Sequence, residues 1–379
     1  MIQIVTADGR AEQQVISAMR ARQAQANAAI EAAVAEIFNT VKENGFSAVR
    51  DYSLCFDHAE PREIRREELD AAYAACPGAL IAALEHAAAN IRDYNEKLLS
   101  HTLEWSSPDG GVVGRIVRGL KRVGVYVPGG TAAYPSSVLM NAVPAKVAGV
   151  EEIVMVTPPT GNLNHAVLAA AKIAGVDRVI AVGGAQAVAA LTYGAGFIPR
   201  VDKLVGPGNA YVAAAKRMAY GTLDIDMVAG PSEVLVIADE TARPKDVAAD
   251  LLSQAEHDKL ASAVLLTTSA ALAQAVDAAL VGQTGYLSRS EIMECALRDF
   301  GCAIVCRDLE QAAQLANEIA PEHLEIMTAD PRALLPAIRN AGAVFLGAWS
   351  PEPLGDYLAG PDHVLPTSGT ARFFSPLSV

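Results

Sequence analysis

The sequence predicts an α/β protein with two parallel-sheet regions that follow an N-terminal helical region. Three observations lead to this prediction: helical periodicity before residue 100, an internal echo of helix–strand units after residue 123, and a second α/β stretch after residue 230. A chain of 379 residues is also long enough for more than one domain.

The first hundred residues have the periodicity of helices. Apolar residues recur at helical spacing from Ile30 to Val41, and Gly45 provides a stop. A second helical stretch is expected over 67–99, with an interruption at 76–78, where the sequence reads Cys-Pro-Gly. We find no candidate for chemistry in this region and expect it to be scaffold.

An internal echo marks the first sheet region. Residues 146–156 (KVAGVEEIVMV) are matched 26 positions later by residues 172–182 (KIAGVDRVIAV). In each copy a helix is expected to end at the glycine and a β-rich strand to follow. With further apolar strands predicted at 123–127 and 201–205, these units indicate a parallel sheet.

The strands of this sheet end in glycine-rich loops at 128–130, 158–161, 183–186 and 206–209. In parallel sheets the ligand crevice lies at the carboxyl ends of the strands, and glycine lets main-chain amides approach a ligand closely. No loop reads Gly-x-Gly-x-x-Gly, so the usual dinucleotide fingerprint is absent. The pattern is compatible with a nucleotide-sized ligand and equally with tight turns that bind nothing.

A second α/β stretch begins near Gly230, with a strand predicted at 234–238 and a helix that opens at Pro244. Four polar residues share one face of this helix: Asp246, Asp250, Gln254 and His257. Such a stripe is ordinarily the solvated side of an amphipathic helix. The Gln-x-x-His spacing is also compatible with a site for a divalent metal or a substrate.

Residues 320–324 (APEHL) place a carboxylate and an imidazole side by side, Glu322 and His323. Such a pair on a short, stiff segment could move protons twice in one active site, although similar pairs also occur on solvated surfaces. After a strand predicted at 343–346, the chain enters a loop rich in carboxylates. From spacing alone, the candidate zinc ligands are His257, Asp356 and His363, and spacing does not nominate Gln254.

Composition and charge restrict the possible partners. The formal charge of −13 and the scattered basic residues argue against nucleic acid as a partner. No stretch is apolar enough for a membrane span, and the N-terminus does not have the pattern of a signal peptide. Five cysteines without a Cys-x-x-Cys pair favour the reducing cytoplasm, and Cys302 and Cys306 are expected to be core residues of a buried strand.

Several motifs together resemble the histidinol dehydrogenase family. In chain order they are VYVPGG at 125–130, GGAQA at 183–187, GPGNA at 206–210, AGPSEVLVIAD at 229–239, SQAEH at 253–257, PEHL at 321–324, and GDY at 355–357 with HVLPT at 363–367. The resemblance runs from the N-terminal helices to about Phe374. It implies two Rossmann-like parallel-sheet domains: the start of the first domain within 1–125, an inserted NAD-binding domain over 126–231, and the remainder of the first domain over 232–379.

The resemblance also implies an activity and a set of roles. The family oxidises L-histidinol twice with NAD, through an aldehyde, to make histidine at a zinc site. Glu322 and His323 would be the catalytic proton-transfer pair. Zinc would be bound by Gln254, His257 and Asp356. NAD would be bound by Tyr126, Gln186 and Asn209. The substrate would be bound by Ser232, Gln254, His257, His323, Asp356 and His363. The expected assembly is a homodimer.

The sequence departs from the family pattern after the Ser-Pro-Leu-Ser run, since it ends at Val379. Family members continue into a helical tail that is exchanged with the partner subunit and supplies one more zinc-binding histidine and a substrate-binding glutamate. We therefore expect three zinc ligands from this chain, with impaired turnover as one consequence. Two alternatives stay open: a paralogous dehydrogenase of another small polar alcohol, such as a sulfonated diol, and a catalytically silent ligand-binding homologue.

Overall fold

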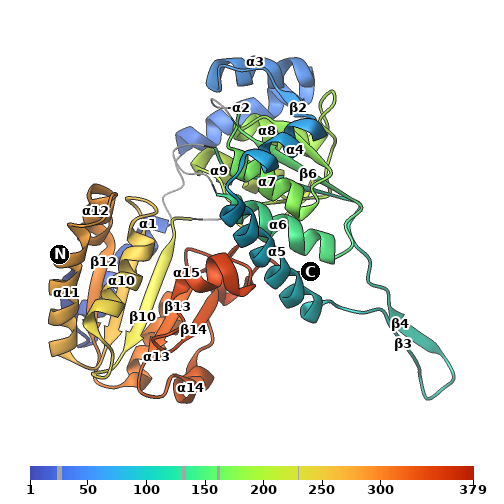
Figure 1. The fold of residues 1–379 in the computed structure, drawn as a ribbon. Helices are drawn as coiled ribbons and strands as arrows, with labels where there is room; N and C mark the ends of the chain where they lie inside the picture. Colours follow the sequence, from blue (N-terminus) through green and yellow to red (C-terminus); the bar gives the residue numbers. More distant parts are fainter. Residues whose placement is uncertain (24–27, 130–133, 160–162, 229) are drawn as a thin grey trace. The chain divides into compact units, whose positions relative to one another are not determined.

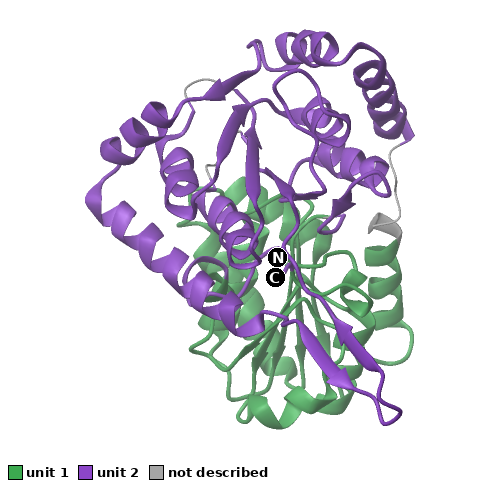
Figure 2. Cartoon of the chain, turned by 90° about the vertical axis from the view of Figure 1, so that its right-hand side faces the viewer, with its two compact units in different colours: residues 1–26, 229–355, 365–376 green, residues 27–228, 356–364, 377–379 purple. Residues whose placement is uncertain are grey.

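The computed structural model describes residues 1–23, 28–129, 134–159, 163–228 and 230–379. It divides into two compact units (Figure 2). Unit 1 comprises Met1–Ala26, Ala229–Gly355 and Leu365–Pro376. Unit 2 comprises Asn27–Val228, Asp356–Val364 and Leu377–Val379. Each unit contains one six-stranded sheet, so the two predicted parallel-sheet regions are confirmed.

The sheet of unit 1 is entirely parallel and has the order β1-β12-β11-β10-β13-β14. Its strands, in that order, are β1 (Gln3–Thr6), β12 (Gly301–Val305), β11 (Ser262–Thr267), β10 (Glu233–Ala238), β13 (His323–Met327) and β14 (Ala343–Leu346). Strand β13 lies between β10 and β14, with His323 opposite Val234 and Ala343. This register brings the start of β13 next to the start of β10 (Figure 1).

Side chains along these strands point alternately to the two faces of the sheet, so unit 1 has one core cluster on each face. Val234, Val236 and Met327 pack in one core cluster with the helices α10 (Pro244–Ala255), α11 (Ala270–Thr284) and α12 (Ser290–Phe300). Leu235 and Leu324 pack in the other with α1 (Ala11–Gln23), α13 (Leu309–Ile319) and α14 (Pro331–Leu334). Because successive strand side chains point to opposite faces, His323 and Glu325 lie on the same face as Met327, which α10 covers.

The sheet of unit 2 has the order β2-β7-β6-β5-β8-β9 and is parallel except for the edge strand β2. Its strands, in that order, are β2 (Arg62–Ile64), β7 (Arg178–Ala181), β6 (Glu152–Thr157), β5 (Arg122–Tyr126), β8 (Lys203–Val205) and β9 (Asp224–Ile225). One core cluster contains residues of α4 (Arg66–Ala75), α5 (Gly78–Leu98), α6 (Pro135–Val147) and α7 (His165–Ala174). The other contains residues of α2 (Ala28–Asn44), α3 (Phe46–Phe56), α8 (Gly184–Tyr193) and α9 (Ala210–Ala219).

The local predictions agree well with these elements. Helix α2 ends just before Gly45, and the interruption predicted at 76–78 separates α4 from α5. The echo corresponds to the successive units α6–β6 and α7–β7, and Gly175 ends α7 in the left-handed conformation that glycine favours. Helix α10 begins at Pro244. The spacing of apolar residues and the positions of glycine and proline were therefore sufficient to locate these helices and strands.

The unit boundaries differ from those expected from the sequence. Unit 2 begins at Asn27, whereas the inserted domain was expected at 126–231. Helices α2 to α5 contribute to the two core clusters of the unit 2 sheet, so they belong with that sheet. An NAD-binding role for this unit stays a prediction.

A separate hairpin, β3 (Leu103–Ser106) paired with β4 (Val112–Arg115), is exposed along its whole length. The remaining short elements are α15 (Glu352–Leu354), the π-helical turn η2 (Gly355–Ala359), and the turns η1 (Leu335–Ala337) and η3 (Thr370–Arg372). Of the helices in the described ranges, none is both long and apolar enough to cross a membrane.

Candidate active site

Glu322 and His323 lie at the amino end of β13 and are almost completely buried, with 7% and 2% of their surfaces exposed. Helix α13 ends at Ala320, which adopts a left-handed conformation, and Pro321 then leads the chain into the strand. A solvated surface pair, the alternative left open by the sequence, is therefore wrong. A buried carboxylate next to a buried imidazole needs specific partners.

The main chain of Glu233 contacts both members of this pair. Its N–H donates to Oε2 of Glu322 at 2.9 Å, and its carbonyl oxygen lies 3.1 Å from Nδ1 of His323. Because a carbonyl oxygen can only accept, this contact requires Nδ1 to carry a hydrogen. In the neutral ring Nε2 is then the atom that can take up a proton.

Glu352 is a third titratable group at this position. Its Oε1 lies 3.9 Å from Nε2 of His323, and its Oε2 accepts a hydrogen bond of 3.0 Å from Ser253 of α10. The Glu352 main-chain N–H donates to Oε1 of Glu325 at 2.8 Å. The imidazole thus has a main-chain carbonyl at one nitrogen and a buried carboxylate near the other.

The polar stripe of α10 is only partly solvated. Asp246 forms a partly exposed ion pair with Arg243, whereas Asp250 and Gln254 are buried. Among the described residues, Oε1 of Gln254 has no hydrogen-bond partner. His257 follows in the turn after the helix, where its N–H donates to the carbonyl oxygen of Gln254 at 3.1 Å. A buried amide oxygen without a partner, close in sequence to a histidine, fits a metal ligand set.

Asp356 and His363 lie near each other in unit 2, with 3.8 Å between Oδ2 of Asp356 and Nδ1 of His363. Between them, Asp362 is buried and accepts a hydrogen bond of 2.8 Å from the N–H of Val364. Burial raises the pKa of Asp362 well above its usual range. Both carboxyl groups are buried, and Asp356 is the one that lies beside His363.

The three residues predicted to bind NAD lie at the carboxyl end of the unit 2 sheet. Tyr126 ends β5, and its hydroxyl oxygen accepts a hydrogen bond of 3.0 Å from the N–H of Gly184. Burial raises the pKa of Tyr126 to about 12, so its phenol stays protonated. Gln186 is buried on α8, and its Oε1 has no hydrogen-bond partner within the part of the chain that the structure describes. Asn209 caps α9 by accepting from the N–H groups of Tyr211 and Val212.

The comparisons with known proteins agree on one family. The family model for histidinol dehydrogenase matches residues 20–379. The histidinol dehydrogenase of Clostridium acetobutylicum is 54% identical over 365 residues, covering 95% of this chain and 85% of that protein. The enzyme of Bacillus subtilis is 53% identical over 350 residues, covering 91% and 82%. A crystal structure of histidinol dehydrogenase from Elizabethkingia anophelis is 37% identical with a TM-score of 0.94, covering 100% of this chain and 87% of that one.

The chain belongs to the histidinol dehydrogenase family. Members of this family are oxidoreductases of histidine biosynthesis, and the chain is an enzyme of that class. The resemblance carried by the sequence motifs is thereby confirmed.

Some motif residues of this histidinol dehydrogenase family member lie outside the described residues. They are Gly130, Thr160 and Gly161 of the strand-end loops, and Ala229 at the start of the second α/β stretch. Ser232 is described. It lies directly before β10, and its carbonyl oxygen accepts from the N–H of Ser262 at 3.0 Å.

The sequence patterns of this family member do not single out four further candidates that the structure places near the site: Glu233, Ser253, Glu325 and Glu352. Glu233 acts through its main chain, which no residue pattern reveals. Ser253 and Glu325 read as ordinary residues of a helix and a strand. Glu352 follows the Trp-Ser-Pro run after β14, and only its place beside His323 distinguishes it from other loop carboxylates.

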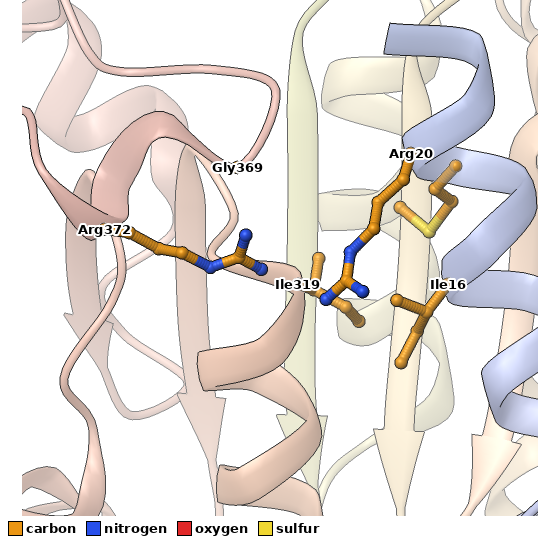
Figure 3. A pocket seen from close by; sticks show the side chains of 6 residues that line it. Ile16, Arg20, Ile319, Gly369 and Arg372 are labelled. Atoms are coloured by element: carbon orange, nitrogen blue, oxygen red, sulfur yellow. The ribbon is translucent and has the colours of Figure 1, made fainter. Parts of the chain in front are cut away.

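Two buried cysteines and a small pocket in unit 1 are not among the candidate site residues. Burial raises the pKa of Cys302 to about 12 and that of Cys306 to about 11, as expected for core thiols. A small pocket in unit 1 is lined by Ile16, Met19, Arg20, Ile319, Gly369 and Arg372 (Figure 3). Both arginines donate to the carbonyl oxygen of Glu318, so their hydrogen-bonding capacity is partly used within the fold.

Proposed function

We propose that this chain oxidises L-histidinol to L-histidine in two NAD-dependent steps, through histidinal, at a site that binds zinc. The observation that carries this proposal is the buried Glu322–His323 pair, whose two side chains are both fixed by the main chain of Glu233. A base whose tautomer is set by a carbonyl oxygen is suited to repeated proton transfer.

In the first oxidation, Nε2 of His323 takes the proton of the substrate alcohol. The contact between Nδ1 and the carbonyl oxygen of Glu233 keeps Nε2 available as the accepting atom. Glu352, 3.9 Å from Nε2, favours the charged imidazolium that results. NAD, when bound, accepts the hydride in each oxidation.

In the second oxidation, Glu322 takes a proton from the water that hydrates the aldehyde. One oxygen of its carboxylate accepts from the N–H of Glu233, which fixes the orientation of the group. Burial excludes bulk water, so the carboxylate acts on a positioned water molecule. As the hydrate forms, the imidazolium of His323 gives its proton from the first oxidation to the aldehyde oxygen. The neutral ring can then take the proton of the hydrate as the second hydride leaves.

Gln254, His257 and Asp356 are the zinc ligands in this proposal. The buried amide oxygen of Gln254, which lacks a partner among the described residues, supports it. Zinc, when bound, would hold the nitrogen atoms of the substrate and so position the reacting carbon. The same ligands would contact the substrate together with Ser232, His323 and His363.

Tyr126, Gln186 and Asn209 are the NAD-binding residues in this proposal. Their place at the carboxyl end of a parallel sheet supports it, since that edge is where nucleotides bind in open α/β sheets. The buried Oε1 of Gln186, which has no partner in the described ranges, is available to a ligand donor.

A homodimer and a cytoplasmic location complete the proposal. The exposed apolar side chains of the β3–β4 hairpin, among them Leu103, Trp105 and Val113, are compatible with self-association. A particle mass of one chain, 39.6 kDa, in sedimentation equilibrium would contradict the dimer.

The test is an NADH-production assay with zinc present, in which histidinol, histidinal and a sulfonated diol are offered separately. We expect turnover of the first two substrates and none of the diol. Glu322→Gln should lower kcat for histidinal by about a hundredfold, the usual range for loss of a general base, and affect the histidinol step less.

Turnover of the diol with none of histidinol would identify a paralogous alcohol dehydrogenase. Absence of turnover with every substrate, despite stoichiometric zinc, would indicate a silent binding protein. Equal loss of both oxidations in Glu322→Gln would contradict the role given to Glu322.

A further inference from the structure

Glu325 is a buried acid that the proposed mechanism does not use. It follows His323 by two residues on β13, so both side chains lie on the sheet face that α10 covers. Only 1% of its surface is exposed. A carboxyl group in such a position is costly unless it is neutral or fully hydrogen-bonded.

One hydrogen bond connects Glu325 to the surroundings of His323. Its Oε1 accepts the main-chain N–H of Glu352 at 2.8 Å. A second acid, Asp250, is buried on α10, and its charge raises the pKa of Glu325 further. Among the described residues, Oε2 of Glu325 has no hydrogen-bond partner.

Burial favours the neutral form of Glu325. Burial, followed by the charge of Asp250, raises the pKa of Glu325 to about 9. Burial also raises the pKa of Asp250. At neutral pH Glu325 therefore adds no charge beside His323, and its Oε1 accepts from the Glu352 N–H.

Helix α10 and strand β13 each hold Glu352 at one point. Ser253 of α10 donates to the Glu352 side chain at 3.0 Å. Glu325 of β13 accepts the Glu352 main-chain N–H at 2.8 Å. The carboxylate held in this way lies 3.9 Å from Nε2 of His323, where it can stabilise the imidazolium.

We propose that Glu325 is a positioning residue of the oxidation: its carboxyl oxygen accepts the main-chain N–H of Glu352 and so fixes the Glu352 carboxylate opposite Nε2 of His323. The inference rests on the proposed function, in which His323 transfers the proton. Glu325 touches neither substrate nor cofactor in this scheme and acts through Glu352.

The test compares two replacements of Glu325 in the zinc-loaded protein with NAD. In Glu325→Gln, the amide oxygen can still accept from the Glu352 N–H, so we expect kcat to stay within about threefold of the unmodified chain. In Glu325→Leu this hydrogen bond is lost, and we expect kcat to fall about tenfold or more with little change in the KM for NAD, as for a displaced catalytic group. If the Leu replacement prevents folding, Glu325→Asp serves instead, because the shorter acid cannot reach the Glu352 N–H.

A second background separates positioning from general structural damage. In Glu352→Gln, the carboxylate that Glu325 positions is already neutral, so adding Glu325→Leu should lower kcat by less than about twofold. An equal loss in both backgrounds, or a Gln replacement as slow as the Leu replacement, would overturn the inference. His323→Asn is the control for the underlying mechanism: if it kept full activity, the proposed function itself would fail.

Discussion

At the scale of single residues, the proposed site depends on main-chain contacts of Glu233, which cannot be recognised from residue types. The sequence predicts Glu322 and His323 because the two titratable groups adjoin each other. It could not predict that Glu233 fixes both, because the contacts are made by main-chain atoms and follow from the pairing of β10 with β13. Glu352 was missed for a related reason, since it meets His323 only through the folding of the loop after β14.

The protonation of Glu325 makes folding stability depend on pH. Its pKa is about 9 in the folded chain against an ordinary value of 4.5, so between these values the folded form keeps a proton that the unfolded form has lost. The stabilisation is complete below about pH 4.5 and is lost as pH rises towards 9. Glu325→Gln has no such proton and should become more stable relative to the unmodified chain with rising pH, by at most about 1.4 kcal/mol per pH unit. Urea unfolding from pH 5 to 9 measures this, and parallel stability curves would show that Glu325 is ionised in the fold.

At the scale of elements, the candidate site residues lie at the carboxyl ends of the strands in the unit 2 sheet and at the amino end of a strand in the unit 1 sheet. In unit 2, Tyr126, Gln186 and Asn209 lie at the carboxyl ends, where the general rule for parallel sheets places a ligand. In unit 1, the proposed proton-transfer pair of Glu322 and His323 lies at the amino end of β13. The glycine-rich loops made the first arrangement predictable. No comparable pattern marked the second, which depends on the register of β13 against β10.

The loop at 206–209 is fixed by a buried ion pair. Lys216 of α9 pairs with Asp226, donates to the carbonyl oxygen of Gly206 at 2.8 Å, and is 3% exposed. Asp226 in turn accepts from the N–H of Gly206 at 2.8 Å. Gly206 needs this support because it has a φ of +108° and lies so near Tyr126 that a Cβ would be 2.2 Å from the Tyr126 carbonyl oxygen.

Replacing Lys216 should therefore damage both stability and cofactor binding. Lys216→Met leaves Asp226 as an unpaired buried charge and should cost about 3–5 kcal/mol of unfolding free energy, with weaker NAD binding. The matched control is Lys203→Met, which removes a more exposed pair with Asp224 and should cost at most about 1 kcal/mol. Urea unfolding and NAD titration test both variants, and equal losses would contradict this role of the buried pair.

At the scale of the whole molecule, the sequence predicted two sheets but not how the chain divides between them. Strand β1 pairs with β12, so that Gln3 lies opposite Cys302, although the two positions are 299 residues apart in the chain of 379. Helices α2 to α5 pack on the unit 2 sheet although all of its strands except β2 follow them in sequence. Periodicity reports local structure, whereas these pairings are decided by which apolar faces match in three dimensions. Domain boundaries drawn along the sequence were therefore less informative than the elements.

Hydrogen exchange over the whole chain can locate both cofactors at once. A ligand that binds only the closed form lowers the rate of opening in the segments that hold it, by about a hundredfold at a concentration a hundred times its Kd. NAD should protect amides at 183–186 and 206–209 in unit 2, where the N–H of Gly184 already bonds to Tyr126. Removing zinc with a chelator should expose amides at 250–257 in unit 1, where Gln254 and His257 lie, and leave the NAD-protected loops unchanged. Helix α11 serves as the internal control, because no proposed ligand residue lies on it. Protection by NAD confined to unit 1, or a uniform response across the chain, would contradict the assignment of the two sites.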